Sequence, residues 1–504
     1  MRGVVAAGHP LTAQAGVEVL RDGGNAVDAA VAAVLMSFVA ESPLTGPGAG
    51  GFMLVHSAGG ENALLDFFVA APGKGLDAQP APLTPIDVTF AEEAVQRFNV
   101  GPSSCGAYGT TLGLADALER FGSLGLPEVT EGPARSAREG VEIVRMQAFL
   151  FTILEPILRS TPEGEAIYAP RGELLREGDT LRLPELGDLL ERLGAEGPGF
   201  LYTGDVASAV SEWVLARGGL LSTEDLASYE TVEREPARVR YRGREVLTNP
   251  PPSSGGILIA DALGILERLE RPHGTFVVAE VIASTNRARD EEFLLGLATE
   301  GYLEQFLAKD ALDSVATEVR SRLGNTTHIA VMDGEGGCAS VTCSNGSCSG
   351  VVVPGTGVHL NNMLGEQDLN PHGYHRYEPG VRVPSMMSPT VVLRDGAPEL
   401  ALGSAGSNRI RSAILQTILA VVDDGETAEE AVRRPRLHVE DQVVEAEPGV
   451  DPDALDRLEA NGWTVRRWSE QNLFFGGVQA VARSGDELTG GGDPRRGGVA
   501  ARVA

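Results

Sequence analysis

One segment near the start of the chain restricts the possible folds more than any other. Residues 26–39 (AVDAAVAAVLMSFV) follow Asn25, a residue suited to a helix N-cap, and they are apolar nearly all round. A helix without a polar face has to be covered on every side, so we expect it in the interior of a large folded unit. The apolar stretch is too short to span a bilayer, and Glu41 and Pro43 end it.

The remaining pattern predicts sheets that are built from both ends of the chain. Helical spacing is expected over residues 11–20, most of 110–300 and 410–422, and strands are expected over 52–56, 63–68, 327–332, 339–342, 391–393 and 399–402. Strands at both ends with helices between them predict one layered α/β unit with sheets at its centre.

The balance of charge argues against nucleic-acid and membrane-surface partners. The 504 residues include 41 Lys plus Arg and 70 Asp plus Glu, a formal net charge of −29, which repels phosphate groups and anionic lipids. A hydrophobic content of 42% and a charged content of 22% are ordinary for a globular protein. If Met1 is the true start, the first residues lack a secretion signal, and we expect a cytoplasmic protein.

Two patterns that look like ligand sites are weak. Residues 46–51 (GPGAGG) fit a dinucleotide-binding glycine pattern, but they follow a predicted helix and precede a predicted strand, the reverse of the required order. Cys338, Cys343 and Cys348 lie close together, but their spacing is not that of a zinc site and no second pair of ligands accompanies them. A metal at these cysteines stays an alternative; we expect structural cysteines and neither a metal nor an organic cofactor.

Several short motifs, each weak alone, occur in a specific order. They are residues 8–11 (GHPL), 23–30 (GGNAVDAA), 48–54 (GAGGFML), 219–229 (GLLSTEDLASY), 250–256 (PPPSSGG), 326–328 (TTH), 360–362 (LNN), 385–390 (SMMSPT), 403–406 (GSAG) and 493–495 (DPR). In this order they resemble the γ-glutamyltransferase (glutathione hydrolase) family. The resemblance covers nearly the whole chain and is weakest around residues 75–105 and 275–320.

The resemblance implies an N-terminal-nucleophile hydrolase, a four-layer αββα sandwich made as one chain that cuts itself before a threonine. The implied scissile bond is Asn325–Thr326, which gives a large-subunit segment, residues 1–325, and a small-subunit segment, residues 326–504, in one interleaved unit. A threonine hydroxyl is a weak nucleophile, and the cut frees an α-amino group, of unperturbed pKa about 7.7 to 8.0, to act as its base. The alternative is an ordinary Thr-Thr pair at a strand entry.

Three further residues complete the catalytic site that the resemblance implies. Ser344 stands for the second hydroxyl residue that orients Thr326. The segment 403–408 (GSAGSN) matches the glycine-rich oxyanion loop, with Gly406 and Ser407 as backbone N–H donors. The family usually has two glycines here, but a backbone donor survives a change of side chain.

The acyl pocket implied by the resemblance departs from the family pattern. The arginine that grips the α-carboxylate of a γ-glutamyl group is replaced by Phe68, which removes a charge-assisted pair and offers an apolar wall. Glu366 can still meet an amino group. The other pocket positions fall on Asn345, Met363, Ser385 and Met386, and Arg376 and Arg382 are open candidates to replace the missing cation.

We therefore expect an autoprocessed amide hydrolase or acyltransferase that forms an acyl-enzyme on Thr326. Its substrate is expected to be a small-molecule amide, of γ-glutamyl (glutathione) type by resemblance, with an altered acyl specificity. Its own two fragments are expected to remain partners, and a homo-oligomer is left open. The alternative is a non-catalytic relative that keeps the sandwich as a binding or scaffold protein, which the altered pocket motivates.

Overall fold

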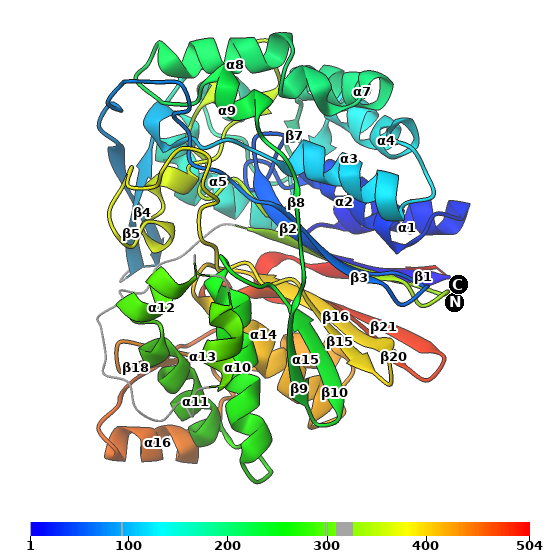
Figure 1. Ribbon diagram of the computed structural model, residues 1–504, viewed down its shortest axis with the longest axis vertical. Helices are drawn as coiled ribbons and strands as arrows, with labels where there is room; N and C mark the ends of the chain where they lie inside the picture. Colours follow the sequence, from blue (N-terminus) through cyan, green and yellow to red (C-terminus); the bar gives the residue numbers. More distant parts are fainter. Residues whose placement is uncertain (1, 92–93, 298, 300, 309–325, 504) are drawn as a thin grey trace.

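Two β-sheets stacked face to face form the middle of the molecule, and helices cover both outer faces (Figure 1). The computed structural model describes residues 2–503 except 92–93, 298, 300 and 309–325. One sheet has the order β22 (Val499–Val503), β1 (Gly3–Ala7), β11 (Thr327–Asp333), β12 (Cys338–Ser344), β2 (Gly50–His56), β3 (Asn62–Phe67) and β8 (Val232–Arg234). The other has the order β21 (Glu487–Gly492), β20 (Gly477–Ser484), β16 (Ala397–Ala405), β15 (Thr390–Arg394), β10 (Arg244–Thr248) and β9 (Ala237–Tyr241).

Alternate residues of the strands fill two different cores, because successive side chains of a strand point to opposite faces. In β1, Val4 and Ala6 pack between the two sheets, with Ala401 of β16 in the same cluster. Val5 and Ala7 of β1 pack outward, in the cluster that contains the first helices. Both sheets are therefore buried on both faces, which explains strands that read as continuous apolar runs.

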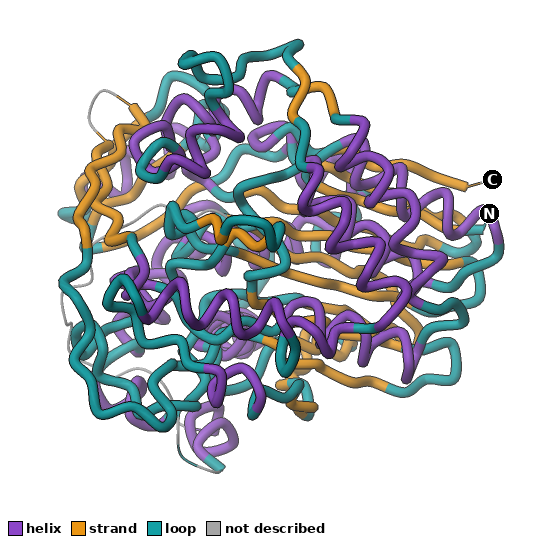
Figure 2. Tube along the Cα trace, turned by 90° about the horizontal axis from the view of Figure 1, so that it is seen from above, coloured by secondary structure: helices purple, strands orange, loops and turns teal. Residues whose placement is uncertain are grey.

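The helices lie in two groups on the outer faces, and Figure 2 shows their purple tubes across the orange strands. The group on the side of the first sheet is α1 (Pro10–Asp22), α2 (Ala26–Ala40), α3 (Thr110–Phe121), α4 (Leu126–Glu139), α5 (Arg145–Leu158), α6 (Pro162–Tyr168), α7 (Pro184–Glu196), α8 (Asp205–Leu215) and α9 (Thr223–Ala227). The group on the side of the second sheet is α10 (Ser254–Arg268), α11 (Thr275–Ala288), α12 (Glu291–Gly296), α13 (Tyr302–Ala308), α14 (Arg409–Val422), α15 (Ala428–Arg433) and α16 (Pro452–Ala460). The four-layer αββα sandwich predicted from the sequence is confirmed.

Smaller sheets and turns connect these layers. The two-stranded sheets are β4 (Thr84–Ala91) with β5 (Ala94–Val100), β6 (Val141–Glu142) with β7 (Thr180–Leu181), and β13 (Val352–Val353) with β14 (Val358–His359). A three-stranded sheet consists of β17 (Leu437–Glu440), β18 (Val443–Ala446) and β19 (Thr464–Arg467).

Helix α2 confirms the apolar segment as an interior helix. All of its residues are buried, and Asn25 and Asp28 form a capping box at its N-terminus. The second carboxylate oxygen of Asp28 accepts the N–H of Asn25 at 2.8 Å, and the Asn25 side chain accepts N–H groups of the first turn. The N-cap residue and the apolar composition, both read from the sequence, therefore indicate the same buried helix.

The two ends of the chain interleave within the sheets. Strand β1 lies between β22 and β11, so the first strand is flanked on both sides by strands from the last third of the chain. Strand β12 in turn pairs with β2. Both termini lie side by side at one edge of the sandwich (Figure 1).

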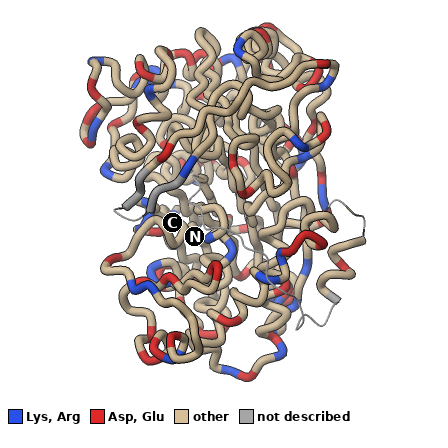
Figure 3. The backbone as a smooth tube through the Cα atoms, turned by 90° about the vertical axis from the view of Figure 1, so that its left-hand side faces the viewer, with Lys and Arg blue, Asp and Glu red and all other residues tan. Residues whose placement is uncertain are grey.

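Acidic and basic positions occur in both halves of the molecule (Figure 3). Some of them lie in the strands, among them Arg244 and Glu245 of β10. Within the described part of the chain, none of the helices combines the length and the apolar character that crossing a bilayer requires.

Candidate active site

Thr326 stands at the entry of a central strand. It directly precedes β11, in which Thr327 pairs with Cys343 of the antiparallel neighbour β12. Extending this register by one residue places Thr326 opposite Ser344, at the ends of two adjacent strands. Thr326 is 7% exposed and Ser344 is 1% exposed. The other half of the predicted cleavage site, Asn325, lies outside the described residues.

Thr326 and Ser344 share a hollow with most of the other predicted site residues. The hollow has a volume of about 420 Å³, which includes space that is open to solvent. It is lined by Phe68, Thr326, Ser344, Gly346, Met363, Glu366, Asp368, Leu369, Ser385, Met386, Met387, Ser407 and Ile410. Segments far apart in the sequence therefore meet at one site, and we call this hollow the acyl cavity.

Asn345 is the predicted pocket residue that does not line the acyl cavity. Its side-chain amide donates to the carbonyl of Pro43 at 3.3 Å, and its backbone N–H donates to Leu44 at 2.8 Å. The side chain thus lies against the loop that precedes β2. A role of Asn345 in substrate binding stays a prediction.

The predicted oxyanion loop connects β16 to α14. Gly406 has φ 121° and Ser407 has φ 50°, both in the left-handed region, and a Cβ on residue 406 would lie 3.0 Å from Cα of Gly476. Their carbonyls accept the first N–H groups of α14, whereas neither of their own N–H groups has an acceptor within the described chain. Two N–H groups at a helix N-terminus are suited to stabilise negative charge.

The side chain of Ser407 forms a separate hydrogen bond at the wall of the acyl cavity. Its hydroxyl donates to the Asp368 carboxylate, which links the oxyanion loop to the short helix Gln367–Leu369. This hydrogen bond offsets part of the cost of a non-glycine residue at positive φ. Asp368 was not predicted from the sequence; its place two residues after Glu366 is the signal that could have found it.

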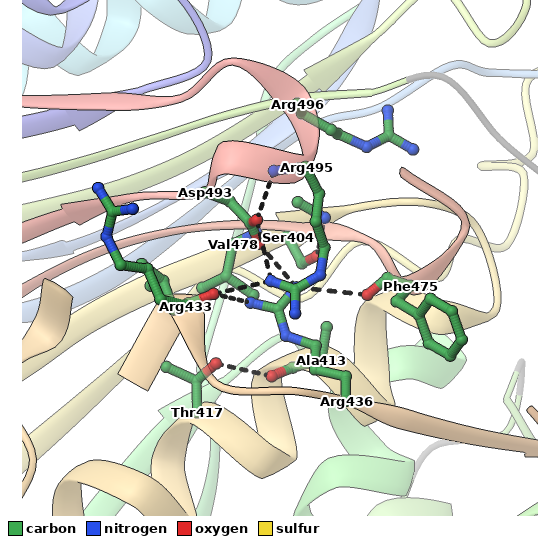
Figure 4. Close-up of polar contacts among 12 residues, drawn as sticks. Ser404, Ala413, Thr417, Arg433, Arg436, Phe475, Val478, Asp493, Arg495 and Arg496 are labelled. Atoms are coloured by element: carbon green, nitrogen blue, oxygen red, sulfur yellow. Dashed lines mark hydrogen bonds and ion pairs between the residues drawn. The ribbon is translucent and has the colours of Figure 1, made fainter. Parts of the chain in front are cut away.

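A buried ion-pair network surrounds Asp493, and it explains the motif at 493–495 (Figure 4). Arg436 pairs with Asp493 at 2.7 Å, and both side chains are at most 2% exposed. Asp493 also accepts the N–H of Val478 at 2.8 Å and pairs with Arg495 at 3.2 Å. Arg495 pairs in addition with Glu447. The network fixes the start of β20 beside the loop.

The start of β20 is joined directly to the end of β16. The N–H of Gly477 donates to Oγ of Ser404 at 3.2 Å, and Arg436 donates to the carbonyl of Phe475 at 3.3 Å. Residue 406 lies tightly against Gly476, directly before β20, so the predicted oxyanion loop contacts the segment that leads into this strand.

Phe68 forms an apolar wall of the acyl cavity. It is 1% exposed, and its ring stacks on Phe52 with a centroid distance of 5.2 Å. Arg382 does not line the cavity; its guanidinium lies 3.5 Å from Asp66 and 4.3 Å from the ring centroid of Tyr229. Arg376 is exposed and does not line it either. In this structure neither arginine stands in place of the missing cation.

A second hollow lies on the other side of Thr326. Its lining includes Thr327, Glu41 and Arg496. Glu41 accepts the hydroxyls of Thr12 at 2.7 Å and Thr327 at 2.8 Å. Burial raises the pKa of Glu41 to about 7, partly offset by these two hydrogen bonds. A Cβ at position 8 would lie 2.6 Å from this carboxylate, which explains the glycine of the 8–11 motif. Sequence reasoning missed Glu41 as a neighbour of the predicted nucleophile.

The cysteines are free and buried. Burial raises the thiol pKa of Cys105, Cys338 and Cys348 to about 12. Where the structure describes the chain, no cluster of three or more His, Cys, Asp or Glu side chains is arranged to hold a metal ion.

Comparison with known proteins identifies the family of the chain. The family model described as gamma-glutamyltranspeptidase matches residues 12–503. The chain is 32% identical to a glutathione hydrolase proenzyme of Escherichia coli (strain K12), over 98% of this chain and 90% of that protein. It is also 32% identical to an acylase ACY 1 proenzyme of Pseudomonas sp. (strain V22), over 97% of this chain and 91% of that protein.

A solved structure supports the fold assignment. A cephalosporin acylase from Bacillus halodurans superposes with a TM-score of 0.82 at 24% identity, covering 99% of this chain and 95% of that chain. The family match over nearly the full length and the shared sandwich lead to one conclusion. The chain belongs to the gamma-glutamyltranspeptidase family of N-terminal-nucleophile hydrolases.

Proposed function

We propose that the protein cuts itself between Asn325 and Thr326 and then hydrolyses or transfers the acyl group of small amides. The observation that carries this proposal is the position of Thr326, at a strand entry opposite Ser344, on the wall of the acyl cavity together with Ser407. In the uncut chain, Thr326 Oγ attacks the carbonyl carbon of residue 325, and the peptide bond is exchanged for an ester. This exchange frees the α-amine of Thr326, and water then hydrolyses the ester, which restores the Thr326 hydroxyl and leaves a carboxylate on residue 325.

In the proposed reaction, this α-amine takes the proton of Thr326 Oγ as the oxygen attacks the substrate carbonyl. The N–H groups of Gly406 and Ser407 stabilise the oxyanion. The ammonium then returns the proton to the departing amine, which leaves an acyl ester on Thr326. Attack by water or by an acceptor amine releases the acyl group and restores the hydroxyl.

The proposed acyl specificity differs from that of a γ-glutamyl enzyme. Leaving a desolvated carboxylate without its arginine costs about 2–5 kcal/mol, which is roughly 30- to 5,000-fold in affinity. With Phe68 at this position, we expect weak turnover of γ-glutamyl anilide and stronger turnover of an acyl anilide without the α-carboxylate. Phe68→Arg should move the ratio toward γ-glutamyl anilide. Efficient γ-glutamyl turnover by the unmodified protein would contradict this specificity.

Denaturing mass spectrometry tests the maturation step. Purified protein should contain fragments 1–325 and 326–504, and Thr326→Ala should remain a single chain. A stable intact wild-type chain that turns over no anilide would refute the proposed function and favour a non-catalytic binding protein.

A further inference from the structure

A further cavity lies between α6 and the loop that precedes β2. It has a volume of about 330 Å³, and its lining comes from the end of α2, residues 42–47, α6, the start of α7 and the hairpin of β13 and β14. None of the described residues lines both this cavity and the acyl cavity. A protein cavity of about 150 Å³ holds one benzene molecule, so this one, which we call the α6 cavity, has room for an aromatic ring with a short chain.

The buried part of the α6 cavity has an apolar wall. Phe38, Leu186 and Val352 line it, and each is at most 5% exposed. An apolar ring is stabilised against such a wall by leaving water, whereas a charged group would lose its hydration there without a partner. The interior therefore suits the ring of a ligand rather than its charges.

Two buried polar atoms belong to residues of this lining. Thr45 Oγ1 and His359 Nε2 each lack a hydrogen-bond partner within the described chain. The other ring nitrogen of His359, Nδ1, lies 3.5 Å from the hydroxyl of Tyr168. Burial lowers the pKa of His359 to about 4, so its imidazole is neutral at physiological pH. A hydroxyl on the ligand ring both donates and accepts, so it can bind either neutral tautomer of His359 as well as Thr45.

Opposite charges lie where the α6 cavity meets solvent. Arg182 is exposed and Glu163 is half-buried, and neither forms an ion pair in the part of the chain that the structure describes. Glu185, the third charged residue of the lining, accepts the N–H of Gly355 at 3.0 Å. One cation and one anion without partners match the carboxylate and the ammonium of a free amino acid.

We propose that the α6 cavity is a second small-molecule site, and that its ligand is a free α-amino acid with a phenol side chain, such as tyrosine. The ring lies in the apolar interior, and its hydroxyl bonds to His359 and Thr45. The carboxylate pairs with Arg182 and the ammonium with Glu163. Because Thr326 takes no part, the proposal is independent of the proposed acyl-transfer function and can be tested on a protein without activity.

Four matched compounds test the ligand class by isothermal titration calorimetry. They are L-tyrosine, L-phenylalanine, which lacks the hydroxyl, tyramine, which lacks the carboxylate, and 3-(4-hydroxyphenyl)propionate, which lacks the ammonium. Tyrosine should bind most tightly. Phenylalanine should bind about tenfold more weakly, because the buried polar atoms stay unpaired. The other two should bind about three- to fivefold more weakly, because ion pairs near solvent are worth less. Tyrosine that shows no saturable binding, or that binds no more tightly than phenylalanine, would overturn the proposal.

Charge variants tie the binding to the α6 cavity. Arg182→Gln should weaken tyrosine binding about three- to fivefold and leave tyramine binding unchanged, since tyramine has no carboxylate to lose a partner. Glu163→Gln should likewise weaken tyrosine but not 3-(4-hydroxyphenyl)propionate. The matched control is Arg135→Gln, at a side chain 60% exposed on α4, which should bind tyrosine as the wild type does.

A bulky residue at the edge of the α6 cavity supplies an independent test. Ala166 lines the cavity from α6 and is exposed, so Ala166→Trp can fill the cavity from its solvent side and leave the core in place. This variant should lose tyrosine binding while its far-UV circular dichroism stays that of the wild type. If the dichroism changes, the charge variants decide the question alone. Tyrosine binding that is unchanged in Arg182→Gln and in Glu163→Gln would place the ligand elsewhere and refute the proposal.

Discussion

At the scale of single residues, the backbone of Ser407 favours glycine, whereas its side-chain contact requires a hydroxyl group. Its backbone adopts φ 50°, which suits glycine, while its hydroxyl holds Asp368. Ser407→Ala keeps the unfavourable backbone and loses a hydrogen bond to a carboxylate, worth about 1.5–3 kcal/mol. Ser407→Gly loses the same bond but relieves the backbone by about 1–2 kcal/mol. We expect thermal stability and kcat/KM to fall in the order wild type, Gly, Ala; an Ala variant equal to wild type would show that the Asp368 contact has no role.

Glu41 predicts a pH dependence of stability with a definite sign. Its pKa is raised to about 7, so between pH 4.5 and 7 the native state holds a proton that the unfolded chain releases. This group therefore lowers stability as pH rises through that window. Glu41→Gln cannot ionise, so relative to wild type it should gain up to about 3 kcal/mol between pH 4.5 and 8. Urea unfolding of both proteins at several pH values measures the difference, and a difference that does not change with pH would contradict the assignment.

The sequence predicted which residues lie at one site, but it did not predict the direction of every side chain. Eight of the residues singled out from the sequence, from Phe68 to Ser407, line one cavity, because the order of motifs reports the topology that joins them. Asn345 and Arg382 differ, since each lies near the site but turns toward another partner, Pro43 and Asp66. Such choices depend on tertiary neighbours that a linear pattern does not contain.

At the scale of elements, the network of Asp493, Arg436 and Arg495 couples β20 to the oxyanion loop. Asp493→Asn removes the charge that balances two buried arginines, and breaking a buried pair costs about 3–5 kcal/mol. We expect a lower melting temperature, and in the protein that remains folded a fall in kcat of at least about tenfold with little change in KM, since oxyanion stabilisation acts on the transition state. Asp456→Asn, at a carboxylate 72% exposed on α16, is the control and should change neither. A lower melting temperature with unchanged kcat would make the network structural only.

The elements with strong periodicity were predicted and the irregular ones were not. The helix expected at 26–39 is Ala26–Ala40, and the hairpin expected around residues 333–337 is β11 and β12. The expectation of mostly helices over 110–300 was incomplete, because β9 and β10 lie there at the edge of the second sheet. Arg242 and Gly243, both at positive φ, form the tight turn between them, a hairpin signal that the helical neighbours concealed.

At the scale of the whole molecule, the proposed cut should not release two separable proteins. Residues before the cut supply β1, β2 and β3 and residues after it supply β11, β12 and β22, all in one sheet. Separating the fragments would break the ladders of β1 with both neighbours and of β12 with β2, and would expose the core between the sheets. We therefore expect fragments 1–325 and 326–504 to co-elute as one particle in size-exclusion chromatography, in low and in high salt alike, because the contacts are mainly apolar and backbone hydrogen bonds rather than surface charges. They should part only in denaturant, in the same transition that abolishes activity. Fragments that separate in native buffer would show that the interleaved sheets do not hold the cut protein together.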